Sequence, residues 1–418
     1  MAAEIDILDD IAIIGAGIAG IALAIALSQR SIPCKIYESK SKDAGTLGSG
    51  VTLGPNGCLV LDRLGLFDRV ASRSYRTESH AVKDAQGNTT TIGNVATEEL
   101  YGYSHHRIYR LTLFQELRAA LEECKVPVQY DAKFDKVIEE TDEGVRFIVN
   151  GEIQKASLLI GADGIHSVVR KHLTSELPQY LGLACIYGHV PTDSIAWPRS
   201  FEKDCTIQDD PGAFFMIPEV HDGTEMMAAR QFVYPALDRA GWEALAADPD
   251  ALVSLLCKDY HQWKSGIVKS LMDQLQLRKD GLLLWPFYRM PKLPTWASPT
   301  ARTIIIGDAA HAMPPSSAQG VNQALEDAYT LSLMLTLRSP GTSLTEALDF
   351  WHGMRQDRID AILKMAERTN AKRLPKTERP VATQVDKSHD LPHALDDLHW
   401  LYRPTMEEEI TAWFGIRT

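Results

Sequence analysis

Short apolar runs alternate with a longer apolar segment near the start of the chain. The run Ile11–Ile14 is followed by a segment with the composition of a buried helix at residues 19–29, and then by the apolar run Cys34–Tyr37. A strand, a helix and a strand in this order form a βαβ unit, which implies a parallel sheet. Similar runs at residues 158–160 and 303–306 predict further strands of the same kind.

The pattern changes at about residue 174. Stretches rich in Val and aromatic residues predict strands of a second sheet, at residues 183–190, 213–218 and 226–233. A segment rich in helical patterns follows at residues 242–277, and residues 342–370 also look helical. Because strand signals of the first kind return near residue 303, we expect the second region to be an insertion. Residues 76–104 are polar and irregular, which suggests a small hairpin.

Three glycines stand between the first strand and the helix, in the order Gly-Ala-Gly-Ile-Ala-Gly. Gly15 permits a tight turn, Gly17 lets a pyrophosphate approach the backbone, and Gly20 lets the helix pack closely on the strand. Glu38 ends the second strand, where a carboxylate can accept hydrogen bonds from a ribose. The combination predicts a dinucleotide cofactor, although Glu38 does not separate FAD from NAD. The structural alternative is a simple glycine turn.

Two further strand ends carry an aspartate. Asp163 follows the run at residues 158–160, with Ser167 as a candidate helix cap, and Asp308 follows the run at residues 303–306. A Pro-Pro turn and a helix expected from about Val321 come next. Strand ends and helix amino termini of this kind bind polar ligands in α/β folds, and reduced flavin suits them. The structural alternatives are a capped turn and, for His311, an ordinary polar turn residue.

The amino-acid composition argues against several kinds of binding partner. The formal net charge of −12 argues against a nucleic-acid partner, which needs a basic surface. The six cysteines are scattered, so we expect a reducing compartment and neither disulfides nor a zinc site. His105 and His106 are expected to be loop residues rather than metal ligands. Residues 11–27 carry no charge, but three glycines interrupt them, so we expect a cytoplasmic protein without a membrane span.

Taken together, these motifs resemble the FAD-dependent aromatic hydroxylase family, the single-component flavoprotein monooxygenases related to p-hydroxybenzoate and salicylate hydroxylases. The matching stretches occur in the family's order and spacing, at residues 15–20 with Glu38, 50–56, 64–65, 110–113, 161–170 and 307–327, and at Arg355 and Arg358. The resemblance implies an α/β fold, a Rossmann-like FAD-binding domain with an inserted, mostly β-sheet substrate domain and a carboxyl-terminal helical segment. The expected divisions are residues 1–173 and 285–370 for the FAD-binding domain with its helix, 174–284 for the substrate domain and 371–418 for a tail.

The resemblance also implies contacts with FAD. The residues implied for its ADP half and phosphates are Gly15, Gly17, Gly20, Glu38 and Arg110. The residues implied for its ribityl chain and ring are Asp308, Pro315, Gly320, Val321 and Asn322. Gly50 and Asp163 are further cofactor-binding candidates, Asp163 for NAD(P)H as well as FAD. Reduced flavin is anionic at its N1/O2 edge, where a helix amino terminus adds a stabilising ~0.3 to 2 kcal/mol per contact.

Two departures from the family pattern bear on the site. Family members commonly have glycine where this chain has Ala318, so we expect a less mobile or differently shaped loop beside the flavin. Related hydroxylases often carry a substrate-contacting arginine where this chain has Tyr187, before Gly188. Tyr187, His189 and Arg230 are therefore candidates for the substrate pocket, although each also fits a solvated strand residue.

The implied activity is that of an FAD-dependent monooxygenase. The enzyme would use NADPH or NADH together with O2 to insert one oxygen atom into an aromatic or conjugated small molecule, through a flavin C4a-hydroperoxide. Hydroxylation is favoured over epoxidation. The alternatives are a flavin-dependent dehydrogenase or reductase on the same scaffold, and a non-catalytic flavin-binding protein. Arg355 and Arg358 are expected to be structural, no metal is expected, and the substrate and the oligomeric state stay open.

Overall fold

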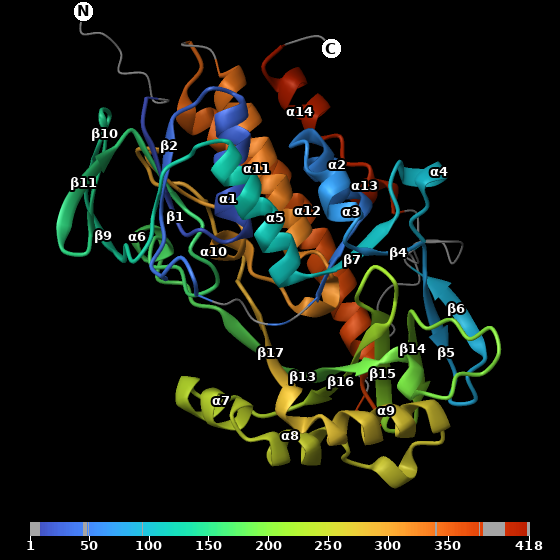
Figure 1. Ribbon diagram of the computed structural model, residues 1–418. Helices are drawn as coiled ribbons and strands as arrows, with labels where there is room; N and C mark the ends of the chain where they lie inside the picture. The colour runs from blue at the N-terminus through green and yellow to red at the C-terminus, as the bar shows by residue number, and fades with distance from the viewer. Residues whose placement is uncertain are drawn as a thin grey trace, which may run out of the picture.

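A five-stranded sheet and a seven-stranded sheet lie in two separate regions of the molecule, and the long helix α12 (Leu344–Arg373) reaches from one to the other (Figure 1). The computed structural model describes residues 9–44, 48, 50–93, 95–338, 341–375, 377–378 and 398–415. Of the tail expected at residues 371–418, positions 376, 379–397 and 416–418 lie outside these ranges. The inserted sheet domain and the carboxyl-terminal helices follow the fold expected from the sequence.

The five-stranded sheet is parallel throughout. Its order is β18 (Thr303–Ile305), β12 (Leu158–Gly161), β1 (Ile11–Ile14), β2 (Cys34–Tyr37) and β8 (Val128–Gln129). Residues Ile14, Tyr37 and Gly161 are paired in register at the carboxyl ends of three neighbouring strands. The glycine turn and both aspartate-bearing loops therefore leave the sheet at one edge.

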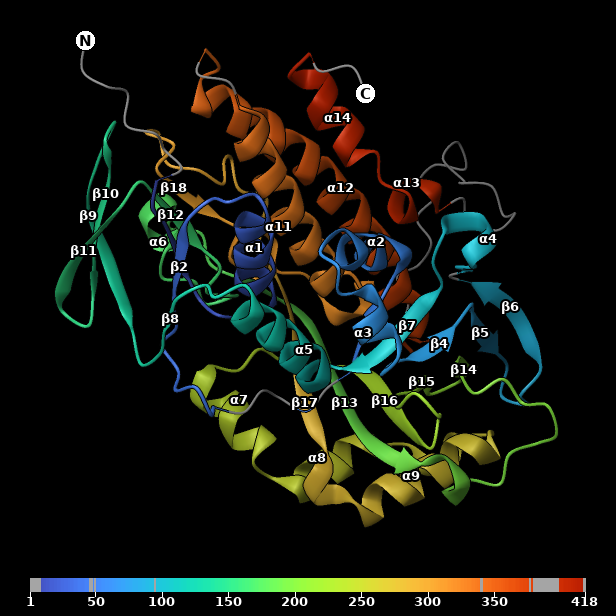
Figure 2. The ribbon, with the colours of Figure 1, turned by 45° about the horizontal axis from the view of Figure 1, so that its top comes forward.

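Helix α1 (Ile18–Gln29) fills the space between this sheet and its neighbouring helices (Figure 2). Residues 18–27 are all buried, and the helix packs against α11 (Gly320–Leu337) and α5 (Arg110–Glu123). A helix that is apolar on every side belongs in a core, which explains the uncharged stretch after Ile11. Within the described ranges, no helix combines the length and apolar character needed to cross a membrane.

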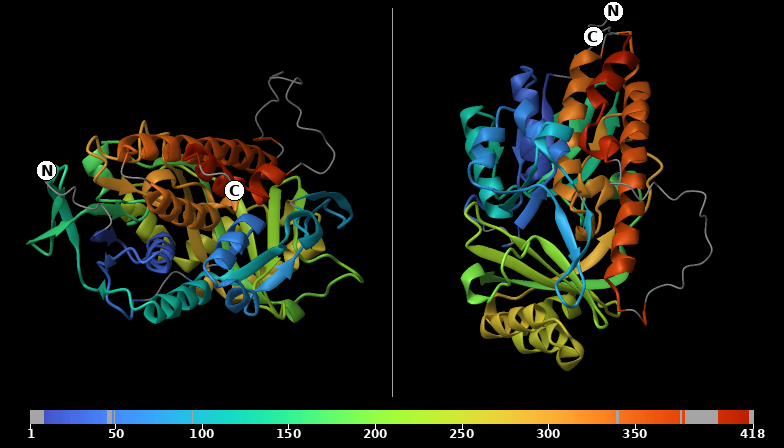
Figure 3. Two further views of the ribbon diagram at one scale, coloured as in Figure 1. Left: turned by 90° about the horizontal axis from the view of Figure 1, so that it is seen from above. Right: turned by 90° about the vertical axis from the view of Figure 1, so that its right-hand side faces the viewer.

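The seven-stranded sheet has helices on one face, seen beneath the strands in the right-hand view of Figure 3. Its strands in order are β17 (Leu283–Arg289), β13 (Gln179–Pro191), β16 (Glu225–Val233), β15 (Gly212–Pro218), β14 (Cys205–Asp209), β5 (His80–Lys83) and β6 (Thr89–Gly93). The covering helices are α7 (Arg239–Ala246), α8 (Pro249–Leu256) and α9 (Gly266–Leu277). The three strands predicted from Val and aromatic content correspond to β13, β15 and β16.

The segment at residues 76–104 is more ordered than the sequence suggests. The expected hairpin forms as β5 and β6, but β5 also pairs in parallel with β14, so the hairpin extends the seven-stranded sheet. His105 and His106 begin strand β7 (His105–Tyr109), and their prediction as loop residues is wrong. β7 lies between β3 and β4, and His106 Nδ1 is 2.6 Å from Ser74 Oγ. The boundaries at residues 174 and 284 stay a prediction.

Smaller elements complete the fold. The strands are β3 (Gly50–Leu53), β4 (Tyr75–Thr77), β9 (Phe134–Thr141), β10 (Gly144–Val149) and β11 (Glu152–Ala156). The helices are α2 (Pro55–Arg63), α3 (Phe67–Ala71), α4 (Glu98–Tyr101), α6 (Arg170–Leu173), α10 (Asp308–His311), α13 (His399–Tyr402) and α14 (Met406–Trp413). Helix α13 packs on α2 and helix α14 on α11, so the described end of the chain covers the first region.

Candidate functional site

The glycine turn after β1 has the geometry of a phosphate cradle. Gly15 has φ +104°, and a Cβ there would lie 2.6 Å from the Ala162 carbonyl oxygen. A Cβ at Gly20 would lie 2.0 Å from the Gly15 oxygen, so only glycine lets α1 approach the strand. A Cβ at Gly17 would meet nothing nearer than 4.0 Å, and Gly17 lines a cavity. Gly15 and Gly20 thus shape the turn, while Gly17 leaves room for a ligand.

Glu38 is held in place at the end of β2. Its Oε2 accepts a hydrogen bond from Ala16 N at 2.7 Å, and its Oε1 accepts one from Lys40 N at 2.8 Å. Oε1 also accepts a hydrogen bond from the Ser39 hydroxyl at 3.2 Å, whereas Oε2 has a further lone pair that can accept a hydrogen bond from a ribose hydroxyl. The predicted role of Glu38 therefore fits its position beside the glycine turn.

Asp163 organises the second loop. Its Oδ2 accepts hydrogen bonds from the N–H groups of Val168 (2.6 Å) and Val169 (3.1 Å), and the Ser167 hydroxyl accepts one from Arg170 N at 2.9 Å. The neighbouring residues Ala162 and Gly164 line the cavity. The hydrogen bonds of Asp163 thus show that its carboxylate closes this loop. A contact between Asp163 and FAD or NAD(P)H stays a prediction.

The third loop runs from Gly307 to the start of α11. The cavity is lined here by Asp308, Pro315, Ala318, Gln319, Gly320 and Val321. Asn322 lies behind this wall, where its side chain accepts a hydrogen bond from Gly54 N at 3.0 Å and donates one to the Thr52 oxygen at 3.1 Å. Of the described side chains, none caps α1 or α11. Their first N–H groups can therefore serve an anionic ligand.

Ala318 adopts the left-handed conformation, with φ +51°. This region costs an L-residue roughly 1–2 kcal/mol and is free of that cost for glycine. The alanine therefore keeps a backbone conformation that favours glycine, at some strain, directly beside the amino terminus of α11. The expectation of a less mobile loop stays a prediction.

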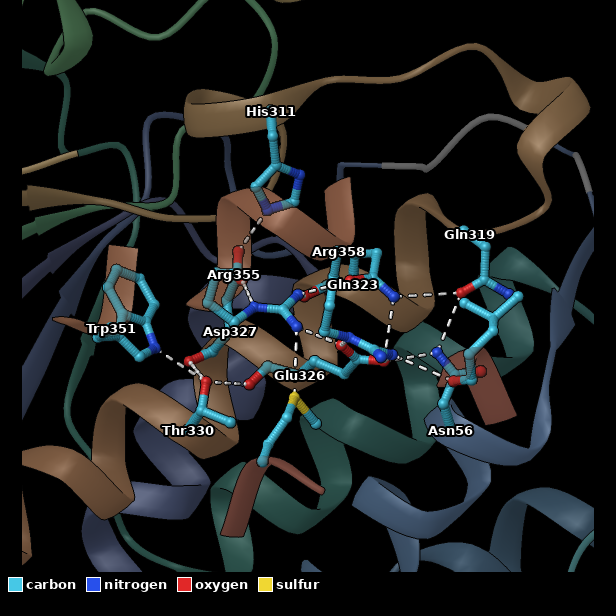
Figure 4. Close-up of polar contacts among 12 residues, drawn as sticks. Asn56, His311, Gln319, Gln323, Glu326, Asp327, Thr330, Trp351, Arg355 and Arg358 are labelled. Atoms are coloured by element: carbon cyan, nitrogen blue, oxygen red, sulfur yellow. Dashed lines mark hydrogen bonds and ion pairs between the residues drawn. The ribbon is translucent and has the colours of Figure 1, made fainter. Parts of the chain in front are cut away.

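Buried charges behind this loop hold it to the long helices (Figure 4). The fully buried Asp327 carboxylate accepts hydrogen bonds from Gly307 N (2.8 Å) and Arg355 Nε (2.8 Å), and lies 2.6 Å from His311 Nε2. Burial alone would raise the pKa of Asp327, but His311 and Arg355 outweigh it and lower the pKa. His311 is thus a buried partner of the network and not an ordinary turn residue.

Glu326 forms the second half of the network. Its buried carboxylate pairs with Arg355 and Arg358, and accepts a hydrogen bond from Asn56 Nδ2 at 2.6 Å. Burial would raise the pKa of Glu326, yet the two guanidinium groups lower it. Asn56 also donates to Gln319 Oε1 at 3.0 Å, which extends the network to the cavity wall. The two arginines therefore have the structural role expected of them.

One cavity of about 380 Å³ joins the three loops to the seven-stranded sheet. Alternate side chains of four strands form its far wall, and they are Cys185, Tyr187, Phe215, Ile217, Met227, Ala229, Trp285 and Phe287. Successive residues of a strand point to opposite faces, so every second position reaches the cavity. The wall is aromatic and apolar, as a binding site for a small aromatic molecule requires.

The three substrate-pocket candidates separate in the structure. Tyr187 lines the cavity, and His189 lies on the same face of β13, 3.9 Å from a Glu219 oxygen, without lining the cavity. Arg230 points to the opposite face, where it donates hydrogen bonds to the carbonyl of Leu256 at 3.0 Å and to that of Lys258. The prediction for Arg230 is therefore wrong, because even-numbered positions of β16 face the helices.

Several polar groups at the cavity were missed by the sequence analysis. Glu219 is fully buried and pairs with Arg107, which lines the cavity. Burial would raise the pKa of Glu219, but Arg107 and His189 together lower it. The cavity-lining residues His80 and Asp204 form a pair with 2.6 Å between Nδ1 and Oδ1. Each pair joins residues more than 100 positions apart, so no local motif signals it.

Two further predicted residues lie at the cavity. Arg110, at the start of α5, and Gly50 both line it. A Cβ at Gly50 would lie 2.0 Å from Glu219 Oε2, so glycine allows the buried carboxylate to approach the backbone. Across the described residues, no group of three or more His, Cys, Asp or Glu side chains is arranged for a metal ion.

Comparison with known proteins places these features in context. The family described as "FAD binding domain" matches residues 9–252 and 298–366. The 3-amino-4-hydroxybenzoate 2-monooxygenase of Streptomyces cremeus is 29% identical over 401 residues, covering 94% of this chain and 95% of that protein. The 3-hydroxybenzoate 6-hydroxylase of Polaromonas naphthalenivorans is 26% identical, covering 93% of this chain and 94% of that protein.

Solved structures share the fold. Klebsiella pneumoniae HpxO complexed with FAD and uric acid has a TM-score of 0.74 at 22% identity, covering 90% of this chain and 92% of that chain. CtdE in complex with FAD and its substrate has a TM-score of 0.75 at 18% identity, covering 97% and 98%. The likeness extends over both sheets of this chain, since each comparison spans nearly all of it.

The buried network makes Arg355 a stability determinant. The substitution Arg355→Leu would leave two buried carboxylates without their shared cation, so we expect destabilisation by about 3–5 kcal/mol. Urea unfolding of the FAD-loaded protein measures it. Arg368→Leu, at an exposed position of the same helix, is the matched control and should change stability little. A loss below about 1 kcal/mol for Arg355→Leu would show that the network is not stabilising.

The same network predicts acid sensitivity. The pKa values of Glu326 and Asp327 are lowered by folding, so the stability they contribute is present above their ordinary values of 4.5 and 3.8 and is lost as pH falls through and below them. Urea midpoints should therefore fall between pH 6 and pH 3. Glu326→Gln should be less stable at neutral pH and show a shallower fall. A parallel fall in both proteins would contradict the assignment.

Because the space at Gly17 is open, a substitution there should affect cofactor binding without affecting folding. Gly17→Val should weaken FAD binding at least about tenfold, equivalent to 1.4 kcal/mol, while leaving the fold intact. Gly20→Val should instead destabilise the protein, because its Cβ would overlap the Gly15 oxygen. The ratio of flavin absorbance to protein absorbance measures FAD occupancy, and the thermal unfolding temperature measures stability. Together they distinguish the two variants. Gly353→Val, at an open position of α12, controls for the substitution itself. Full FAD occupancy of Gly17→Val would rule out the proposed cradle.

Proposed function

The chain belongs to the FAD-dependent aromatic hydroxylases, which are monooxygenases, and we propose that it uses NAD(P)H and O2 to hydroxylate a small phenolic substrate in the cavity between the three loops and the seven-stranded sheet. The observation that carries the proposal is the continuity of that cavity. The glycine turn and the start of α11 form one end, and the aromatic wall of the sheet forms the other. A cofactor and an aromatic ring can thus meet in one continuous cavity.

The residues present fit FAD. Gly17 leaves room for a pyrophosphate, Glu38 is placed for a ribose, and the amino termini of α1 and α11 are free of side-chain caps. When bound, FAD supplies the redox chemistry and the activated oxygen. We infer that the first N–H groups of α11, at Gly320 and Val321, stabilise negative charge on the reduced ring.

The protein's own task in this reaction is to orient the substrate and to exclude water. Tyr187 and the apolar side chains around it form a surface on which an aromatic ring can stack. Phe215 and Phe287, from neighbouring strands, extend that surface. The Glu219–Arg107 pair gives the cavity a fixed polar group without net charge. We infer that these side chains position the ring carbon that is to be oxidised.

The relatives support oxygen insertion over the alternatives. Both named relatives are monooxygenases or hydroxylases by description, and each acts on a hydroxylated benzoate. This favours hydroxylation of a phenolic ring over a dehydrogenase, a reductase or a non-catalytic flavin protein. The six free cysteines favour a reducing compartment, so a cytoplasmic location is part of the proposal.

Labelled oxygen tests the proposal. Phenolic metabolites that stimulate NAD(P)H oxidation by the purified FAD-loaded protein should yield products carrying one atom of label from 18O2, as measured by mass spectrometry. NADPH and NADH are compared in parallel, and benzene derivatives without a hydroxyl serve as controls. Stoichiometric hydrogen peroxide with no labelled product, or a desaturated product, would contradict monooxygenation and favour the dehydrogenase alternative.

A further inference from the structure

Arg373 is brought to the cavity by the last turn of α12. Met365, Thr369 and Arg373 recur at every fourth position, which places them on one stripe of the helix, and all three line the cavity. Figure 1 shows this end of α12 against the seven-stranded sheet near β15 and β16. The helix that anchors the charge network at its centre thus delivers a cation to the aromatic wall at its end.

Among the described residues, the guanidinium of Arg373 has an aromatic neighbour but no anionic one. Its carbon Cζ lies 4.6 Å from the centre of the Phe215 ring. Within the described part of the chain, no carboxylate lies at ion-pair distance and no acceptor receives a hydrogen bond from this side chain. Burial lowers the pKa of Arg373 to about 10, so the group stays charged at neutral pH.

Other buried arginines of the chain do not resemble Arg373. Arg107 pairs with Glu219, Arg355 pairs with two carboxylates, and Arg230 donates to backbone carbonyls. Arg110 also lines the cavity, but at the end assigned to the FAD phosphates. Arg373 is half-buried, and a charge in that position with no anionic partner among the described residues carries a desolvation cost that a bound anion reduces.

We propose that Arg373 binds a carboxylate of the substrate, which is therefore an aromatic carboxylate held with its ring against Phe215 and the neighbouring wall. The planar guanidinium matches a carboxylate with two parallel hydrogen bonds. Tyr187 occupies the strand position at which related hydroxylases often carry a substrate-contacting arginine, and here the charge comes from α12. This assignment rests on the proposed function.

Matched ligand pairs test the assignment on the FAD-loaded protein. Flavin absorbance titrations compare 4-hydroxybenzoate with 4-hydroxybenzamide, and 3-hydroxybenzoate with 3-hydroxybenzamide. The carboxylate of at least one pair should bind roughly 10- to 100-fold more tightly than its amide, the range for a hydrogen-bonded charge. Arg373→Met should abolish the preference and Arg373→Lys should retain part of it, both with full FAD content. Arg368→Met, exposed on the same helix, should leave it unchanged.

Three results would overturn the assignment. The first is that the unsubstituted protein shows no preference for the carboxylate, or binds none of these ligands. The second is that the preference persists in Arg373→Met. The third is that the sole effect of Arg373→Met is a rise in the KM for NAD(P)H. The last would assign Arg373 to the anionic groups of the reductant. Failure of the proposed function looks different. An Arg373-dependent carboxylate preference with no labelled product under 18O2 would retain this assignment and reject the monooxygenase reaction.

Discussion

The ion pair network around Arg355 is the constraint on which the site depends. One guanidinium bridges Glu326 and Asp327, and those carboxylates reach both the Gly307 turn and, through Asn56, the Gln319 end of the loop. These three charged groups are removed from water, and they are stable there only while their mutual geometry is maintained. The network therefore couples the position of the cavity-lining loop to the packing of α11 on α12.

A second constraint is the two-residue period of the substrate sheet. On strand β16, the even-numbered residues pack on α8 and α9, and the odd-numbered residues face the cavity. This alternation decides which side chains can touch a ligand, irrespective of their chemistry. Arg230 is a strong cation that serves the helix layer, whereas its neighbour Ala229 is an inert residue that lines the cavity.

The sequence predicts the parts of the site that depend on local order. The βαβ unit, the glycine turn and the three strand ends follow from apolar runs and from residue types at short spacing. The Glu219–Arg107 and His80–Asp204 pairs and the cation from α12 depend on how distant strands and helices meet. A strand's register cannot be read without its partner, which is why Tyr187 and Arg230 look equivalent in the sequence yet face opposite sides.

The parallel pairing of β5 with β14 has a consequence for how the chain is made. His80 and Asp204, which meet across this pairing, are separated by 124 residues. During synthesis the β5–β6 hairpin leaves the ribosome long before its partner strand, with one edge open to other chains. Completion of the ligand-binding wall is therefore a late event in the life of the nascent protein, after most of the nucleotide-binding sheet has emerged. Chaperone protection would matter most between the emergence of the β5–β6 hairpin and the emergence of β14.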